Sequence, residues 1–303
     1  MTDSLIDIDK KSELNNLPRR YKKISITRYF IYLALIVMVI WSFQGSQFSF
    51  EGLLDSTQYF KRFLGEAFPS IGILGENEHS ITWKDTFRYT RELIETFQMA
   101  FTGTLLGIIF GFILALLSSK GLLGNSRPMR LVQETVKALI LLFRTVPDLV
   151  WAIIFVMLVG LGAFAGTLTI MVDTIGFCGR FFAEEMEDVD KSPADALESC
   201  GATKLDATFA AVVPAAMPGL ITTSLFAFEK AIRGSVILGL VGAGGIGMSL
   251  NALFNWMAYD RAMVIIGMIF ALIFVVEQVS QYLRRKVTQN EEKTNLKQPM
   301  RPG

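Results

Sequence analysis

Residues 192–214 read Ser-Pro-Ala-Asp-Ala-Leu-Glu-Ser-Cys-Gly-Ala-Thr-Lys-Leu-Asp-Ala-Thr-Phe-Ala-Ala-Val-Val-Pro, a compact polar stretch within an otherwise apolar sequence. Its first half predicts a short helix. Ser192 is expected to cap that helix, Pro193 suits its first position, and Asp195 follows three residues after the cap. Gly201 then supplies a left-handed residue that ends the helix at little conformational cost.

The second half of the stretch repeats the pattern. Thr203 and Asp206 predict the cap of a second short helix. Pro214 is expected to close this helix or to bend it into the next apolar segment. The stretch is therefore interpreted as a pair of short helices presented at the end of a membrane segment.

The composition is typical of a protein that crosses a membrane several times. Of the 303 residues, 51% are hydrophobic and 19% are charged, and the mean hydropathy is +0.43. The net charge of +1 argues against a nucleic-acid partner, which would require a basic face. The one histidine, His79, excludes most histidine-based catalytic sites. Cys178 and Cys200 have no metal-ligand spacing, and we expect no disulfide.

Six apolar runs are long enough to predict membrane spans. The third run contains Arg144, Pro147 and Asp148, and the fourth contains Asp173 and Arg180. A charge at such depth costs roughly 2.5–3.5 kcal/mol, so these side chains must face protein or water. Pro147 is expected to kink its helix. The runs cover about 29–45, 97–118, 134–160, 163–183, 214–233 and 260–283.

The segments between the runs predict the domain organisation. Lys and Arg are most frequent in segments that lie on one side of the membrane if the N-terminus is inside, which places both termini and residues 184–214 in the cytoplasm. Residues 46–95 are placed outside, either as interfacial helices with Phe60, Phe63, Leu64, Ala67 and Phe68 on one face or as a loop packed on the spans. The expected parts are a cytoplasmic tail at 1–28, the first span, the external segment, a core at 96–285 and a cytoplasmic tail at 286–303.

Glycines recur every four residues in the second run, at positions 103, 107 and 111. Residues four apart lie on one face of a helix, and glycine lets another backbone approach closely. We therefore expect a tight helix–helix contact along this face.

Residues 242–247 read Gly-Ala-Gly-Gly-Ile-Gly, a formal match to the dinucleotide-binding fingerprint. That fingerprint requires a strand, a helix and a second strand ending in an acidic residue, whereas Asp260 arrives too soon. The better interpretation is a flexible external turn between the fifth and sixth spans that forms part of a gate.

No phosphate-binding loop of the form Gly-x-x-x-x-Gly-Lys-Ser/Thr occurs in the sequence. The sequence also lacks a Gly-x-Ser-x-Gly nucleophile elbow and a His-Glu-x-x-His zinc motif. No catalytic residue and no metal site is therefore predicted, and any ATP that powers the protein must bind another subunit.

Charged residues within the predicted spans are the remaining candidates for a site. Glu229 and Arg233 are four residues apart on one helix and can form an ion pair. One hypothesis is that Arg233 and Arg144 form a positively charged lining of an anion pathway. The other is that the charged residues form structural ion pairs buried between helices. The candidate pathway or buried-pair residues are Arg144, Asp148, Asp173, Glu229 and Arg233, and the candidate hinge or gate residues are Pro147, Gly242, Gly244, Gly245 and Gly247.

The polar stretch resembles the cytoplasmic loop of permease subunits of ATP-binding-cassette (ABC) importers. That loop has the form Glu-Ala-Ala, three residues, Gly, nine residues, Ile, one residue, Leu-Pro. Here Asp195-Ala196-Leu197, Gly201, Ala211 and Val213-Pro214 have this spacing, with Asp, Leu, Ala and Val in place of Glu, Ala, Ile and Leu.

Longer phrases are similar to the permeases of phosphonate importers across residues 92–285. They include Arg-Thr-Val-Pro-Asp-Leu-Val-Trp-Ala from Arg144, Val-Gly-Leu-Gly-Ala-Phe-Ala-Gly from Val159, and Phe-Ala-Glu-Glu from Phe182. Further phrases are Ala-Leu-Glu-Ser-Cys-Gly-Ala from Ala196, and Phe228-Glu229 through Arg233 to Leu-Gly-Leu-Val-Gly-Ala-Gly-Gly-Ile-Gly247.

This resemblance implies the all-α fold of type I importer permeases, in the inner membrane of a bacterium. It implies a second permease copy in a homodimer, cytoplasmic ATPase subunits that bind ATP and Mg, and a periplasmic phosphonate-binding protein. The substrate would be a phosphonate or a related phosphorus oxyanion such as phosphite or phosphate. The residues implied to couple to the ATPase are Asp195, Ala196, Leu197, Glu198, Gly201 and Pro214.

Three other hypotheses remain open at this point. The chain could be a permease for another class of solute, or a structural membrane scaffold. It could also be a membrane enzyme that uses the acids Asp173, Glu184 and Glu229.

Overall fold

The computed structural model describes residues 26–46, 49, 56–61, 65, 83–119 and 127–296, and every regular element within these ranges is a helix. The expectation of an all-α protein is thus confirmed for the described residues. The chain divides into two compact units, Met1–Arg62 and Phe63–Gly303.

The first unit contains one long apolar helix, α2 (Ile26–Gly45), which covers the span expected at 29–45. Its large apolar side chains are exposed from Tyr29 onward. An apolar surface of this kind needs lipid or another protein to cover it. Residues 56–61 form a short helix with Phe60 exposed, and the other members of the expected interfacial face, Phe63, Leu64, Ala67 and Phe68, lie outside the described residues.

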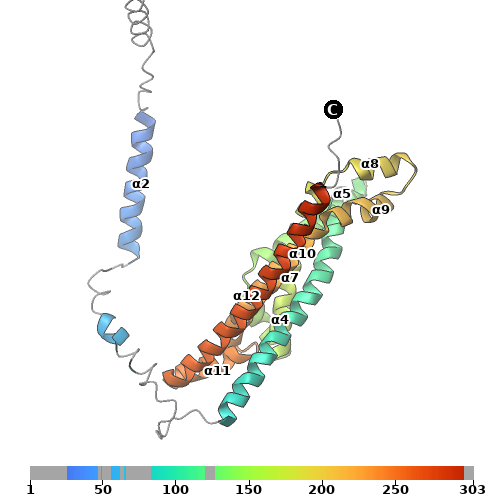
Figure 1. Cartoon of the computed structure of the whole chain (residues 1–303). Coiled ribbons are helices and arrows are strands. Elements are labelled where there is room, and N and C mark those ends of the chain that lie inside the picture. Colours follow the sequence, from blue (N-terminus) through green and yellow to red (C-terminus); the bar gives the residue numbers. More distant parts are fainter. Residues whose placement is uncertain are drawn as a thin grey trace, which may run out of the picture. The chain divides into compact units, whose positions relative to one another are not determined.

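The second unit is a helix bundle (Figure 1). A pair of short helices, α8 and α9, stands at one end of the bundle, and α12 finishes at that same end, whereas α11 lies at the other. The elements are α4 (Trp83–Ser118), α5 (Arg127–Thr145), α6 (Asp148–Val159), α7 (Ala163–Asp188), α8 (Ser192–Ser199), α9 (Lys204–Ala207), the π-helical turn η1 (Thr208–Val212), α10 (Val213–Leu240), α11 (Ile246–Asn255) and α12 (Tyr259–Leu296).

Helix α7 is the centre of the bundle. It packs against α4, α5, α6 and α10, and its buried residues run from Ala165 to Met186. Because neighbouring helices surround it, its buried polar residues Thr169 and Thr174 meet protein rather than lipid.

The contact between α4 and α7 is unusually close, as the glycine spacing predicts. A Cβ atom placed on Gly107 would lie 3.0 Å from the carbonyl oxygen of Met171, so only a hydrogen atom fits there. The same construction on the three glycines brings Gly103 against Ile170, Gly107 against Thr174 and Gly111 against Cys178. Three glycines four apart therefore face three α7 residues that are also four apart, and the expected tight contact is confirmed.

Three apolar clusters follow the length of the bundle. At the α8–α9 end, Phe182 and Met186 of α7 pack with Leu220 of α10. A middle cluster joins α4, α7 and α10, and a third, at the far end, packs α11 between α4 and α12. Thr96 ties this end together, since its buried hydroxyl accepts a hydrogen bond from the Ile246 N–H at 2.8 Å.

The third expected span is broken rather than kinked. α5 and α6 meet at an angle of 91° across Val146 and Pro147. Pro147 has no N–H to continue the α5 hydrogen bonds, and it adopts an extended conformation (ψ 142°) from which α6 begins. The helix also begins earlier than expected, at Arg127 rather than near Glu134.

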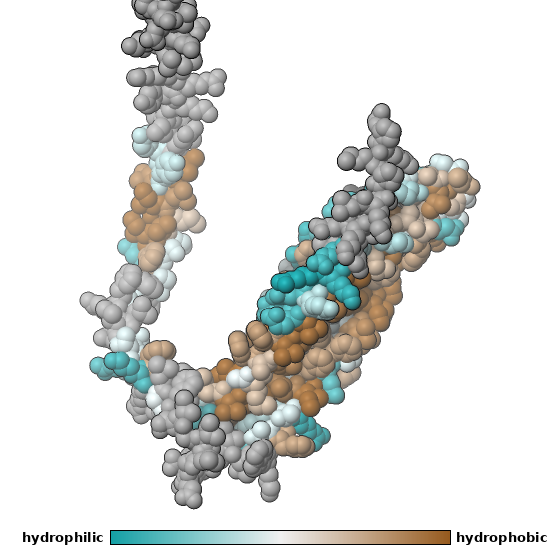
Figure 2. Space-filling model, viewed as in Figure 1, coloured by the Kyte–Doolittle hydropathy of each residue, from teal (hydrophilic) through white to brown (hydrophobic). Residues whose placement is uncertain are grey.

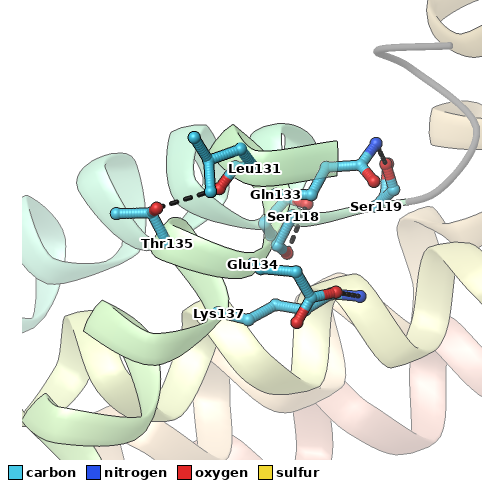
Figure 3. A network of polar contacts seen from close by, with 8 residues as sticks. Ser118, Ser119, Leu131, Gln133, Glu134, Thr135 and Lys137 are labelled. Carbon is cyan, nitrogen blue, oxygen red and sulfur yellow. Dashed lines mark hydrogen bonds and ion pairs between the residues drawn. The ribbon is translucent and has the colours of Figure 1, made fainter. Parts of the chain in front are cut away.

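The junction of α4 and α5 is held by polar contacts (Figure 3). The buried side chain of Gln133 donates to the carbonyl oxygen of Ser119 at 3.5 Å, and the Ser118 hydroxyl donates to the carbonyl of Ala115 at 3.0 Å. The Ser119 carbonyl has no partner within α4, so the Gln133 bond satisfies it and ties α5 to the end of α4.

Several helices extend beyond their predicted ends. α4 begins at Trp83, inside the segment predicted to be external, and α12 continues to Leu296, well into the predicted cytoplasmic tail. Likewise α10 reaches Leu240, beyond the predicted end of the fifth run at 233, so the segment before the sixth run includes its last turns and α11. Polar residues end an apolar run, but they do not end a helix, and this is why the predicted limits are too short.

Three described helices are long and apolar enough to cross a membrane, and the pair α5–α6 adds a fourth if it is one broken span. The three are Asp85–Ser118, Lys204–Leu240 and Tyr259–Val287. On the visible face of the bundle, hydrophobic residues cover much of its length, with a hydrophilic patch partway along it and smaller hydrophilic groups near the ends (Figure 2). The extent of the hydrophobic surface suits a bundle that lies in lipid.

We expect the substitution Gly107→Ala to destabilise the protein by about 1–3 kcal/mol, because the added methyl group must push α4 away from α7. The measurement is the thermal unfolding of the detergent-solubilised protein. Gly267→Ala is the matched control, since a Cβ atom at this glycine of α12 has nothing within 4 Å. Equal stability of the two variants would contradict the tight contact.

Candidate functional site

The α8–α9 elbow, defined here as residues 190–207, begins with a hydrogen-bonded turn. The carboxylate of Asp190 accepts bonds from the hydroxyl of Ser192 at 2.7 Å and from the Ser192 N–H at 3.0 Å. The hydroxyl bond and the amide bond lower the pKa of the exposed Asp190 carboxyl. The prediction that Ser192 caps α8 is therefore wrong. Ser192 is the first residue of α8 and Lys191 occupies the cap position, while the hydrogen bonds of this turn are accepted by Asp190.

The end of α8 has the geometry that the sequence predicts. Gly201 has a φ of +97°. Its N–H donates to the carbonyl of Glu198 at 3.0 Å, and the N–H of Ala202 donates to the carbonyl of Leu197 at 3.1 Å. These two bonds form a Schellman motif, which sets the direction of the chain after α8.

The start of α9 is a reciprocal capping box, also as predicted. The Thr203 hydroxyl accepts from the Asp206 N–H at 3.2 Å, and the Asp206 carboxylate accepts from the Thr203 N–H at 3.3 Å. The second helix does not end at Pro214, however. It continues through the π-helical turn η1 into α10 as one helix from Lys204 to Leu240. Residues 184–188 also belong to α7, so the predicted coupling loop at 184–214 is mostly helical.

The elbow presents both charge and apolar surface. Asp195, Ala196, Leu197 and Glu198 are all exposed on α8, and Ala194 is the residue of that helix that is buried. Exposed Leu205 and Phe209 continue the apolar surface onto α9 and η1. Apolar side chains ringed by carboxylates are typical of a protein–protein contact.

A second group of functional candidates lies between the spans. Lys230 of α10 donates to both carboxylate oxygens of Asp173 of α7, each at 2.8 Å. The α7 and α10 ends nearest to this pair meet each other, because the Gly162 N–H donates to the carbonyl of Gly242 at 3.0 Å. Each charged residue lies ten positions from its helix end, about 15 Å along the axis.

The carboxylate of Glu229 is shared by two guanidinium groups. Arg233 approaches one oxygen at 3.1 Å, which confirms the predicted pair, and Arg284 of α12 bonds to the other oxygen. Glu229 is nearly buried, with 9% of its side chain exposed. Sequence reasoning missed Lys230 and Arg284 as partners, because each contacts a residue more than 50 positions away and Arg284 lies just beyond the predicted end of the sixth span.

Arg144 and Arg233 lie in different surroundings. Arg144 packs over the ring of Phe181 at 5.3 Å and lines a groove of about 310 Å³ between α5 and α7. The groove also holds Arg180, which pairs with Glu184 at 2.7 Å. Asp148 lies instead beside Gly234, with its Oδ2 atom 4.0 Å from where a Cβ atom of that glycine would be.

The glycine-rich turn between α10 and α11 is closely packed, which corrects the expectation of a flexible turn. Gly244 has a φ of +87°, and a Cβ atom on it would collide with the backbone of Ala163 at the start of α7. Gly242, Gly245 and Gly247 are also in close contact, with Leu161, Thr96 and Val236 respectively. The turn therefore locks the end of α10 to α4 and α7.

Comparison with known proteins agrees with this architecture. A phosphite transport system permease protein of Stutzerimonas stutzeri is 33% identical over 236 residues, which cover 78% of this chain and 82% of the relative. A phosphate-import permease protein of Mycolicibacterium smegmatis is 33% identical over 193 residues, which are 64% of this chain and 36% of that protein.

The fold has been seen before in an importer. An inward-facing structure of the MetNI methionine ABC transporter matches with a TM-score of 0.60 at 21% identity, covering 68% of this chain and 99% of that one. A family model described as "Binding-protein-dependent transport system inner membrane component" matches residues 103–289. The chain therefore belongs to the family of binding-protein-dependent transport system inner membrane components.

Proposed function

We propose that this permease carries a phosphorus oxyanion, such as a phosphonate, phosphite or phosphate, into the cell. The observation that carries the proposal is the similarity to a phosphite permease along about four fifths of both chains. A second relative named for phosphate import supports the same class of substrate.

The proposed membrane arrangement has six spans: α2, α4, α5–α6, α7, α10 and α12. α7 is counted although its composition alone does not qualify it, because Lys230 neutralises Asp173 and Glu184 neutralises Arg180. The elbow, the tail at 1–28 and the tail at 286–303 would then be cytoplasmic. Residues 46–95 would lie outside.

The elbow is proposed as the docking site of a separate ATPase that binds ATP and Mg. In an assembly of two permease copies with two ATPase subunits, closing the ATPase pair would push on α8. The Schellman motif and the capping box hold α8 at a fixed angle to α9, and α9 is continuous with α10. A push on the elbow would therefore move a membrane span directly.

A periplasmic binding protein would deliver the substrate at the other end of the bundle. There the Gly242–Gly247 turn joins α10, α11 and α7, and it would form part of the gate. Ligand selection would rest largely on this binding protein.

A role as a membrane enzyme finds no support in the same residues. Asp173, Glu184 and Glu229 are each engaged in an ion pair with a basic side chain, which accounts for their charge without a catalytic role. The family assignment also describes a transport component and not an enzyme.

The test of the substrate class is uptake by the host cell. Deleting the gene should abolish uptake of an isotope-labelled phosphonate, phosphite or phosphate at low concentration, and a plasmid copy should restore it. Labelled methionine is the control solute, because the fold is shared with a methionine transporter. Unchanged uptake of all three phosphorus compounds with loss of methionine uptake would refute the proposal.

The orientation can be read from the native cysteines. Cys200 is exposed on the elbow and Cys178 is buried between α4 and α7. A membrane-impermeant maleimide should label inside-out vesicles and leave intact spheroplasts unlabelled. The variant Cys200→Ala should lose the label, and labelling of spheroplasts at Cys200 would place the elbow on the wrong side.

The coupling role of the elbow predicts an effect of Gly201. Gly201→Val should lower uptake by about fivefold or more, because a β-branched residue at a positive φ adds about 1–3 kcal/mol of strain and turns α8 away from α9. Gly201→Asn is the matched control, since asparagine tolerates this conformation. Membrane abundance is measured in parallel, and normal uptake by the valine variant would remove the coupling role.

A further inference from the structure

One face of α10 carries two cations within a membrane span. Phe226, Lys230, Arg233, Ile237 and Leu240 are spaced three or four residues apart and are all partly or fully exposed in the single chain. Residues with this spacing share one face of a helix. The face is therefore an apolar stripe interrupted by two positive side chains.

This face is unsuited to contact with lipid. Arg233 is seven residues from the end of α10, about 10 Å along the axis. In the proposed six-span arrangement, with this end of α10 at the membrane surface, Arg233 lies within the roughly 30 Å hydrocarbon core. An arginine at such depth costs roughly 2.5–3.5 kcal/mol unless it meets protein or water. The exposed side of Arg233 must consequently meet a second subunit or a water-filled pathway.

The ion pairs on α10 are not balanced in the same way. The charge of Lys230 is neutralised by Asp173, because the Lys230 ammonium contacts both carboxylate oxygens at 2.8 Å. Glu229, in contrast, forms a triad with two cations, Arg233 and Arg284. Of the two arginines, Arg233 is the more exposed, at 44% of its side chain against 28% for Arg284.

We propose that Arg233 is a substrate-binding residue that contacts the phosphorus oxyanion during its passage through the membrane. The inference rests on the proposed function. A guanidinium fork matches two oxygens of a phosphorus oxyanion and keeps its charge at every physiological pH. When Arg233 turns to the anion, Arg284 remains on Glu229, so the buried carboxylate is never left without a cation.

Neighbouring acids keep this contact transient. Asp148 borders Gly234, the residue after Arg233, and Asp173 holds Lys230. Carboxylates beside an anion path weaken anion binding, and a pathway must bind its ion weakly enough to release it. The neighbouring acids therefore favour release of the anion over tight binding at Arg233.

The test compares variants of the complete transporter in proteoliposomes, with uptake of labelled phosphate, phosphite and a phosphonate measured per ATP hydrolysed. Arg233→Gln should lower this ratio by about 10- to 100-fold, the range for a lost hydrogen bond to a charged group. Arg284→Gln removes the other guanidinium from the same carboxylate and should retain more uptake at equal abundance. Arg233→Lys should recover part of the loss.

Arg88→Gln is the outer control, because Arg88 is an exposed member of an i,i+4 pair with Glu92 at 3.7 Å on α4, and it should behave as the wild type. Equal losses at Arg233 and Arg284, or an unchanged ratio for Arg233→Gln, would overturn the inference and make the triad purely structural. A wild-type transporter that moves none of the three anions would instead refute the proposed function.

Discussion

The close approach of α4 to α7 is the constraint on which the rest of the bundle depends. Because Gly103, Gly107 and Gly111 offer no side chains, α4 lies almost against the backbone of α7. α5, α6 and α10 then complete the surroundings of α7. A helix enclosed in this way can carry the charged residue Asp173, since Lys230 of the neighbouring helix α10 pairs with it.

The irregular backbone occurs where the helices surround it or where function needs a change of direction. The break at Pro147 turns α5 into α6, and the turn at Gly244 fits against the start of α7. Within a membrane, backbone groups outside helices are tolerated only where protein or water satisfies them. The α8–α9 elbow stands at one end of the bundle (Figure 1), and the Schellman motif and the capping box satisfy backbone groups at its bend.

The features predicted correctly from the sequence are local ones. The left-handed Gly201, the capping box at Thr203 and the pair of Glu229 with Arg233 each depend on residues within four positions. The predicted cap of α8 was wrong although it also concerns neighbouring residues, because Ser192 donates its hydrogen bonds to Asp190. The contacts of Lys230 and Arg284 were out of reach, since they join helices that only the folded bundle brings together.

The π-helical turn η1 has a consequence for how the elbow meets its partner. A π turn accommodates one residue more than the α-helical ladder would, and each residue of an α-helix turns the chain by about 100°. The side of α9 that faces outward is thus offset from the faces of α10 by the residue inserted at Thr208–Val212. The direction in which the elbow faces its partner therefore depends on the extra residue in η1. It does not depend on which side chains the elbow exposes.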